Sequence, residues 1–179
     1  NVQNLGQPEK FGDIALQTIS DFVNLKVLNL NGSKITNEGL KFITKLKNLQ
    51  ELTLPNFMSI DSISELKALS NLKTVEINHS NYISIKKLAE FTNLKKLSLK
   101  YCYIVTDEIP FFEKMTNLES LNLLNSNINY RYFKHFTKLK NLTELYAPPT
   151  TTTGFKTISK MSNLKSLLIK IRNSQVTTK

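Results

Sequence analysis

The chain has 179 residues and a formal net charge of +10 at pH 7, from 24 lysines and arginines against 14 aspartates and glutamates. A hydrophobic fraction of 40% supplies enough apolar surface for a packed core, which excludes wholesale disorder. No run approaches the roughly 18 apolar residues that a membrane-spanning helix needs, and the lone Cys102 excludes an internal disulfide.

The first predicted element is a helix near the start of the chain. Residues 11–23 carry Ile14, Leu16, Ile19 and Phe22 at helical spacing. We therefore expect residues 1–23 to form an N-terminal helix that covers the first edge of the core. Because the sequence begins with Asn1 instead of Met, we expect a processed or trimmed product, and the localisation is left open.

A repeat follows over residues 24–171. The pattern Asn-Leu-x-x-Leu-x-Leu, in which Val, Ile or Ala stands for some of the later leucines, recurs seven times at spacings of 22 to 24 residues. If the asparagine is position 0, positions −8, −5, −2, +1, +4 and +6 are apolar in every repeat. Self-similarity at this period predicts a solenoid. The repeats begin at Asn24, Asn48, Asn71, Asn93, Asn117, Asn141 and Asn163.

Each repeat is predicted to contain one strand and one short helix. Positions +4 and +6 are separated by a polar residue, which favours a strand with one buried face. Positions −8, −5 and −2 recur every three residues, which favours an α or 3₁₀ turn with one apolar side. The strands must run parallel, since every repeat is traversed in the same direction. The asparagines stand where helix gives way to strand, and we expect a structural role in a left-handed backbone conformation there.

The run Leu25-x-x-Leu28-x-Leu30 and its six counterparts resemble the leucine-rich-repeat family. The resemblance implies an α/β fold, a right-handed βα superhelix or horseshoe with a parallel sheet of about seven short strands on its concave face. Residues 35–40 and 105–109 are similar to helix-backed repeats of ribonuclease-inhibitor-like and bacterial members, and residues 84–88 to internalin-type repeats.

One position departs from the family pattern. Members usually place asparagine at position +9, where its side chain bridges neighbouring coils, so we expect a weaker ladder here. Cys102 is expected to be a small buried residue at this position. The residues found at +9 are Ser33, Phe57, Ser80, Cys102, Ser126 and Thr150.

The last two repeats are irregular, although we expect residues 1–179 to form one domain. Ala147 and the run 148–154, Pro-Pro-Thr-Thr-Thr-Thr-Gly, predict a local bulge or loop. The last strand is expected within 164–171, and no apolar helix follows it in the tail 172–179. Either the tail covers this end, or the chain is truncated and naturally continues, or two copies associate end to end.

The strand residues that point away from the core are the candidate binding surface. Parallel strands lie about 4.8 Å apart, so seven of them span roughly 29 Å, the width of a protein epitope. The family resemblance also implies protein binding. An acidic pair is expected beside a basic pair, with tyrosines and a leucine as anchors. The candidate partner-binding residues are Glu51, Glu76, Asn78, His79, Lys96, Ser98, Lys100, Tyr101, Asn122, Leu124 and Tyr146.

Catalysis, cofactor binding and metal binding find no support in the sequence. The only two histidines, His79 and His135, are more than two repeats apart, and no phosphate-binding glycine loop or metal-ligand spacing occurs. We therefore predict a non-catalytic module that binds a protein ligand, without cofactor or metal.

Three further readings stay open. The setting is either a bacterial surface or secreted host-interaction protein, or an intracellular adaptor such as the substrate-recognition part of a ubiquitin ligase. A different class is polyanion binding, to nucleic acid or anionic lipid, through lysines on the helical face; nucleic acid is the less favoured ligand, because the strands lack an aromatic series for base stacking. The third reading is that the chain is part of an enzyme whose catalytic domain lies outside this sequence.

Overall fold

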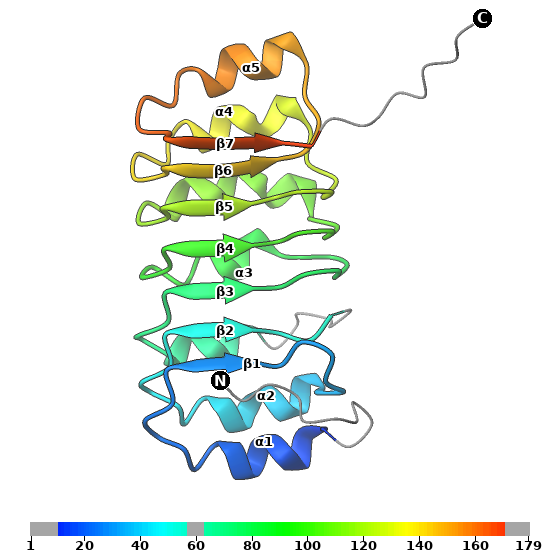
Figure 1. Ribbon diagram of the computed structural model, residues 1–179, viewed down its shortest axis with the longest axis vertical. Coiled ribbons are helices and arrows are strands. Elements are labelled where there is room, and N and C mark those ends of the chain that lie inside the picture. Colours follow the sequence, from blue (N-terminus) through cyan, green and yellow to red (C-terminus); the bar gives the residue numbers. More distant parts are fainter. Residues whose placement is uncertain (1–10, 57–62, 171–179) are drawn as a thin grey trace, which may run out of the picture.

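The computed structural model describes residues 11–56 and 63–170. In these residues the chain winds as successive coils, and each coil adds one strand to a single seven-stranded sheet (Figure 1). Neighbours in the sheet are neighbours in sequence, and all pair in parallel, which confirms the predicted topology. The strands are β1 (Val27–Asn29), β2 (Glu51–Thr53), β3 (Thr74–Glu76), β4 (Lys96–Ser98), β5 (Ser120–Asn122), β6 (Glu144–Ala147) and β7 (Ser166–Ile169).

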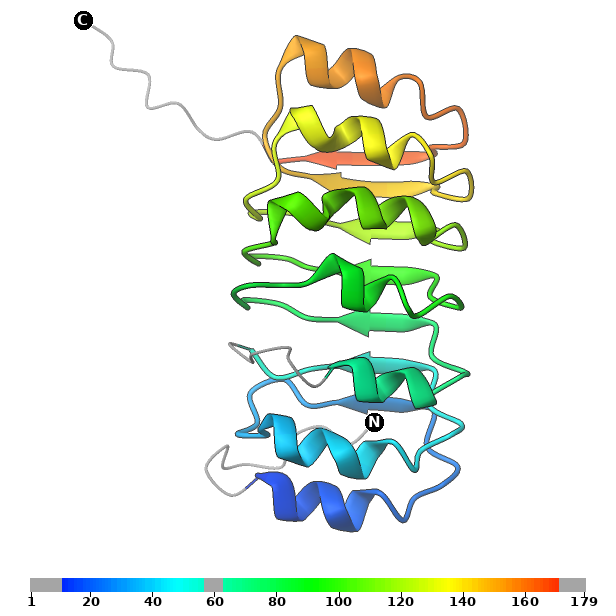
Figure 2. The ribbon, with the colours of Figure 1, turned by 180° about the vertical axis from the view of Figure 1, so that it is seen from behind.

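Helical segments cover one face of the sheet and leave the other face open (Figure 2). Some coils use an α-helix and others a 3₁₀ helix, as the three-residue spacing allows. The α-helices are α1 (Asp13–Ile19), α2 (Asn37–Ile43), α3 (Ile85–Leu88), α4 (Phe133–Phe136) and α5 (Thr152–Ile158). The 3₁₀ helices are η1 (Ile63–Ala68), η2 (Thr106–Lys114) and η3 (Tyr130–Tyr132).

The core is a continuous stack of apolar side chains from the repeated positions. In repeats 2 to 6 every residue at the six apolar positions is buried. In the first and last repeats some are not: Phe22 is exposed, and Phe155 and Leu167 are 48% and 40% exposed. The end coils have a described neighbour on one side only, so the same pattern buries less surface there.

The repeated asparagines have a different role from the predicted one. The side-chain amide of Asn48 donates to the carbonyl of Val23 at 2.9 Å, and that of Asn93 donates to the carbonyl of Ser70 at 2.9 Å. Asn71, Asn117, Asn141 and Asn163 make the same bond to the preceding coil. None has a left-handed backbone, so that prediction was wrong. These six bonds, here called the asparagine ladder, join successive coils.

The left-handed conformation occurs instead at position +8. Gly32, His79, Tyr101 and Asn125 have φ between 54° and 77° there. The hydroxyls at position +9 do not replace the missing asparagine, because Ser33 and Ser126 donate to carbonyls of their own coil. Cys102 alone of the described +9 residues donates across coils, to the carbonyl of Ile77; Phe57 lies outside the described residues.

The first helix and the sixth repeat also differ from prediction. Leu16 and Ile19 of α1 are buried, but Ile14 is 83% exposed, so only part of the expected apolar face joins the core. The loop expected over 148–154 ends earlier, because the Thr151 hydroxyl accepts from the amide of Gly154 and starts α5. The predictions for residues 1–10 and for the tail 172–179 lie outside the described residues.

Candidate protein-binding surface

A shallow hollow of about 380 Å³ lies on the face of the sheet that the helices leave open. Strands β3 to β6 and the residues just after β3 and β4 line it. The aligned register places side chains from the same repeat position next to one another across the coils. Seven of the candidate residues meet here: Glu76, Asn78, Lys96, Ser98, Lys100, Asn122 and Tyr146.

Two asparagines order the hollow from within. The Asn78 carbonyl oxygen accepts from the Ser98 hydroxyl at 2.9 Å and from the Lys100 amide at 3.2 Å. The Asn122 carbonyl oxygen accepts from the Leu124 amide at 3.1 Å. These bonds fix the backbone where the strands end, so the side chains that follow are presented from a rigid support.

The charges in the hollow are mixed and solvated. Glu76 forms no salt bridge with Lys96 or Lys100 in the described part of the chain. Both signs are therefore available to a partner without first breaking an internal ion pair.

The other four candidates lie outside the hollow. Glu51 pairs in register with Val27 and Thr74, so it is separated from the basic pair by a row of the sheet and does not join it as expected. Leu124 is half-buried beside the hollow, and His79 and Tyr101 lie just past the ends of β3 and β4.

His79 and Tyr101 form a stacked pair. Their ring centroids are 4.4 Å apart with an interplanar angle of 12°, and the Lys100 ammonium lies 5.4 Å from the centre of the Tyr101 ring. Both residues have φ near 55°. A left-handed conformation costs a side-chain-bearing residue about 1–2 kcal/mol, and Gly32 and Asn125 hold the same position at lower cost.

A second aromatic pair, which the repeat pattern does not predict, lies at the same edge. The rings of Tyr82 and Tyr103 are 5.9 Å apart, and Tyr82 is 77% exposed with φ of 56°. These tyrosines follow β3 and β4 at positions +11 and +10, beyond the strand residues that the repeat pattern singled out. The signal was the presence of bulky aromatic residues in adjacent repeats next to His79 and Tyr101.

Cys102 and His135 lie away from this surface. Cys102 is buried, and burial raises the pKa of its thiol to about 11, as suits a small core residue. The His135 Nδ1 atom lies 2.7 Å from the Glu113 carboxylate on the helical side, so the two histidines do not meet.

Residues 11–56 and 63–170 contain no group of three or more His, Cys, Asp or Glu side chains placed to hold a metal ion. No helix in that part of the chain is long and apolar enough to cross a membrane.

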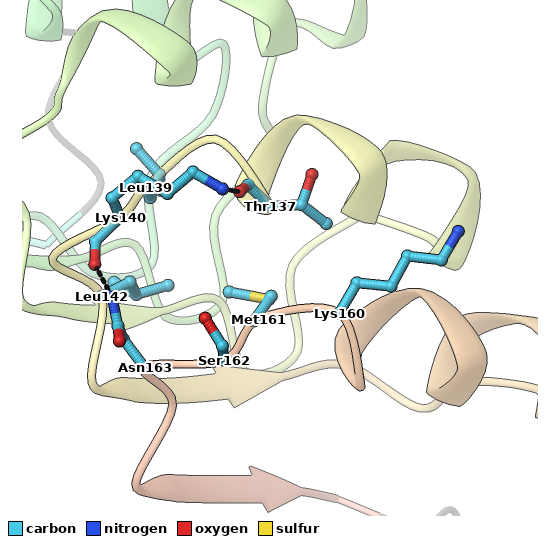
Figure 3. Close-up of a pocket in the computed structure, with 8 residues that line it drawn as sticks. All are labelled: Thr137, Leu139, Lys140, Leu142, Lys160, Met161, Ser162 and Asn163. Carbon is cyan, nitrogen blue, oxygen red and sulfur yellow. Dashed lines mark hydrogen bonds between the residues drawn. The ribbon is translucent and has the colours of Figure 1, made fainter.

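Lysines line the edge of the sheet where the strands begin, as well as the helices where they were expected. They recur at positions −3, −1 and +2, between each helix and the next strand. In the middle of the solenoid two lysines are paired with carboxylates: Lys95 of this edge with Glu119 at 2.5 Å, and Lys67 of η1 with Glu90 at 3.6 Å. Lys140 and Lys160 line a small hollow between the last two coils (Figure 3).

The repeat, the parallel in-register sheet and the helical backing define a leucine-rich-repeat solenoid. Among solved structures, the chain is similar to internalin C2 from Listeria monocytogenes, with a TM-score of 0.68 and 19% identity over 90% of this chain and 77% of that one. It is also similar to a leucine-rich-repeat protein from Leptospira interrogans, with a TM-score of 0.57 and 25% identity over 91% of this chain and 41% of that one.

Sequence comparison finds a human relative. The chain is 29% identical to Baculoviral IAP repeat-containing protein 1 from Homo sapiens, in a match that covers 72% of this chain and 10% of that protein. The chain therefore spans about a tenth of the length of the curated relative it matches. No protein-family model matches the sequence.

Proposed function

We propose that this chain is a non-catalytic module that binds a protein ligand on the open face of its sheet. The observation that carries the proposal is the gathering of seven candidate side chains in one ordered hollow. A broad, shallow and polar hollow with a tyrosine in it suits a protein surface better than a small molecule, which binding sites enclose.

The aromatic rim extends this surface. Tyrosine and histidine rings held by stacking offer contact area at low entropic cost. Position +8 accepts Gly32 and Asn125 more readily, so the strained Tyr101 supports a role for its ring at the surface.

The test is quantitative affinity capture with three versions of the chain. A face variant carries Lys96→Glu, Lys100→Glu and Tyr146→Ala, and a control variant carries Lys134→Glu and Lys156→Glu on the helices. We expect proteins captured by the wild type and the control to fall at least tenfold with the face variant, since loss of one or two central contacts costs about 2 kcal/mol each. A captured set that is the same for all three versions would contradict the proposal.

For the setting, we propose a bacterial surface or secreted protein, with an intracellular adaptor as the alternative. The similarity to solved repeat proteins from Listeria monocytogenes and Leptospira interrogans supports the bacterial origin that the first setting requires, and the relative from Homo sapiens keeps a eukaryotic origin as the alternative. The full coding sequence decides between them, because a secretion signal upstream of these repeats belongs only to the first.

A further inference from the structure

The last two coils carry a group of lysines without acidic partners. Lys138 and Lys160 stand at position −3 of repeats 6 and 7, Lys140 at position −1 and Lys165 at position +2. In the described part of the chain none of the four forms a salt bridge, in contrast to Lys95, which stands at position +2 of repeat 4 and pairs with Glu119. We call these four residues the lysine cluster.

Polar hollows separate members of the lysine cluster. Lys140 and Lys160 line the hollow of Figure 3, and Lys140 and Lys165 line a second one of about 310 Å³. The Lys140 ammonium donates to the carbonyl of Thr137 at 3.0 Å, which holds it at this edge. No acidic residue lines either hollow.

An apolar hollow of about 540 Å³ adjoins the cluster on the last coil that the structure describes. Phe155, Ile158, Met161 and Leu167 supply its apolar lining. It shares Lys165 with the second polar hollow, together with Ser162 and Leu164, so the charged and apolar parts are continuous.

We propose that this end of the solenoid binds an anionic lipid surface, with lipid phosphates on the lysine cluster and acyl chains against Phe155 and Leu167. Adjacent cationic and apolar lining matches the charge and shape of an anionic lipid, whose phosphate lies next to its hydrocarbon chains. Nucleic acid fits less well, because no aromatic residue lines the polar hollows to stack on bases. Such attachment is peripheral, and it leaves the hollow on the sheet face open to a protein.

Flotation with lipid vesicles tests the proposal on the whole chain. We expect binding to phosphatidylcholine vesicles that contain about one third phosphatidylserine, and at least about tenfold weaker binding to phosphatidylcholine alone. The variant Lys138→Ala, Lys140→Ala, Lys160→Ala, Lys165→Ala should lose at least about tenfold of the partitioning.

Matched variants separate this site from the general charge of the chain. A control with Lys34→Ala, Lys45→Ala, Lys73→Ala and Lys86→Ala removes the same charge from the first four repeats and should bind vesicles nearly as the wild type does. Equal loss in both variants would overturn the proposal, since overall charge would then explain the binding. The variant Phe155→Ser, Leu167→Ser should also weaken vesicle binding, and unchanged binding would overturn the placement of acyl chains.

The same variants test two other occupants of this end, a second copy of the chain and nucleic acid. Sedimentation that shows dimers of the wild type, lost with Phe155→Ser and Leu167→Ser in the absence of vesicle binding, would overturn the proposal in favour of a second copy of the chain. Tighter binding of a DNA duplex than of the anionic vesicles, with the same dependence on the lysine cluster, would overturn it in favour of nucleic acid.

Discussion

At the scale of single residues, substitutions of Tyr101 distinguish a binding role of its ring from a structural role. The variant Tyr101→Asn relieves a left-handed strain of about 1–2 kcal/mol and loses a ring stack of about 0.5–1.5 kcal/mol. We expect these terms to offset each other, so that the free energy of unfolding in urea changes by less than about 1 kcal/mol while partner capture falls. Tyr101→Phe, which keeps both terms, is the control. A loss of more than about 2 kcal/mol would assign the ring to the fold.

Cys102 gives a second residue-level prediction. With a thiol pKa of about 11, only about a thousandth of Cys102 is thiolate at pH 8, against about a quarter for an ordinary cysteine. Ellman's reagent should therefore react at least about a hundredfold more slowly with the native chain than with the chain in denaturant. Equal rates would show that the thiol is open to solvent.

Only some of the residue positions in the candidate site could be predicted from the sequence. Glu76 and Lys100 could be placed on one face by counting from the repeat asparagine. The stack of His79 on Tyr101 could not, because it depends on a left-handed turn that neither residue type favours strongly. That Glu51 lies outside the hollow could not be predicted either, since counting along a repeat does not say which strands a hollow follows, and its part in partner binding stays a prediction.

At the scale of elements, the asparagine ladder joins each coil to the one before it. Asn93→Ala should lower the free energy of unfolding by about 0.5–1.5 kcal/mol, the net value of one hydrogen bond. Asn24 is the matched control, because its amide donates no bond among the described residues, and Asn24→Ala should change stability by less than about 0.5 kcal/mol. Equal losses of unfolding free energy in the two variants would mean that the asparagines stabilise the chain through their local backbone preference and not through the hydrogen bond between coils.

The strand and helix of each repeat could be predicted from periodicity alone. The asparagine ladder could not be predicted in this way. The sequence of one repeat identifies the asparagine as a turn residue but does not identify the carbonyl of the preceding coil to which its side chain donates. The early start of α5 has a similar origin. Thr151 caps the helix, and Gly154 admits the close approach of Thr150, where an added Cβ would lie 1.8 Å from the hydroxyl.

At the scale of the whole molecule, stability should depend on where a coil stands in the stack. Leu121 and Leu167 occupy the same repeat position, but Leu121 is fully buried and Leu167 is 40% exposed. We expect Leu121→Ala to cost about 2–5 kcal/mol of unfolding free energy and Leu167→Ala less than about 1 kcal/mol. Similar costs from thermal or urea unfolding would show that the seventh coil is covered in solution.

The expectation that two copies associate end to end belongs to the same scale and stays a prediction. The exposed Phe155 and Leu167 are consistent with it, and they serve equally the lipid surface proposed above. Sedimentation at increasing protein concentration separates these outcomes without any ligand.

The asparagine ladder carries a consequence for how such chains change length. Because each asparagine reaches back to an equivalent carbonyl, removing residues 93–116 would let Asn117 follow Thr92 and find the backbone of the coil then before it in the same place. Gain or loss of an entire repeat therefore leaves an equivalent carbonyl for every later asparagine, and the repeat spacings of 22 to 24 residues show that the ladder also accommodates changes of one or two residues within a repeat. Duplication of a repeat would widen the open face of the sheet, and loss of a repeat would narrow it, without any change to the remaining repeats.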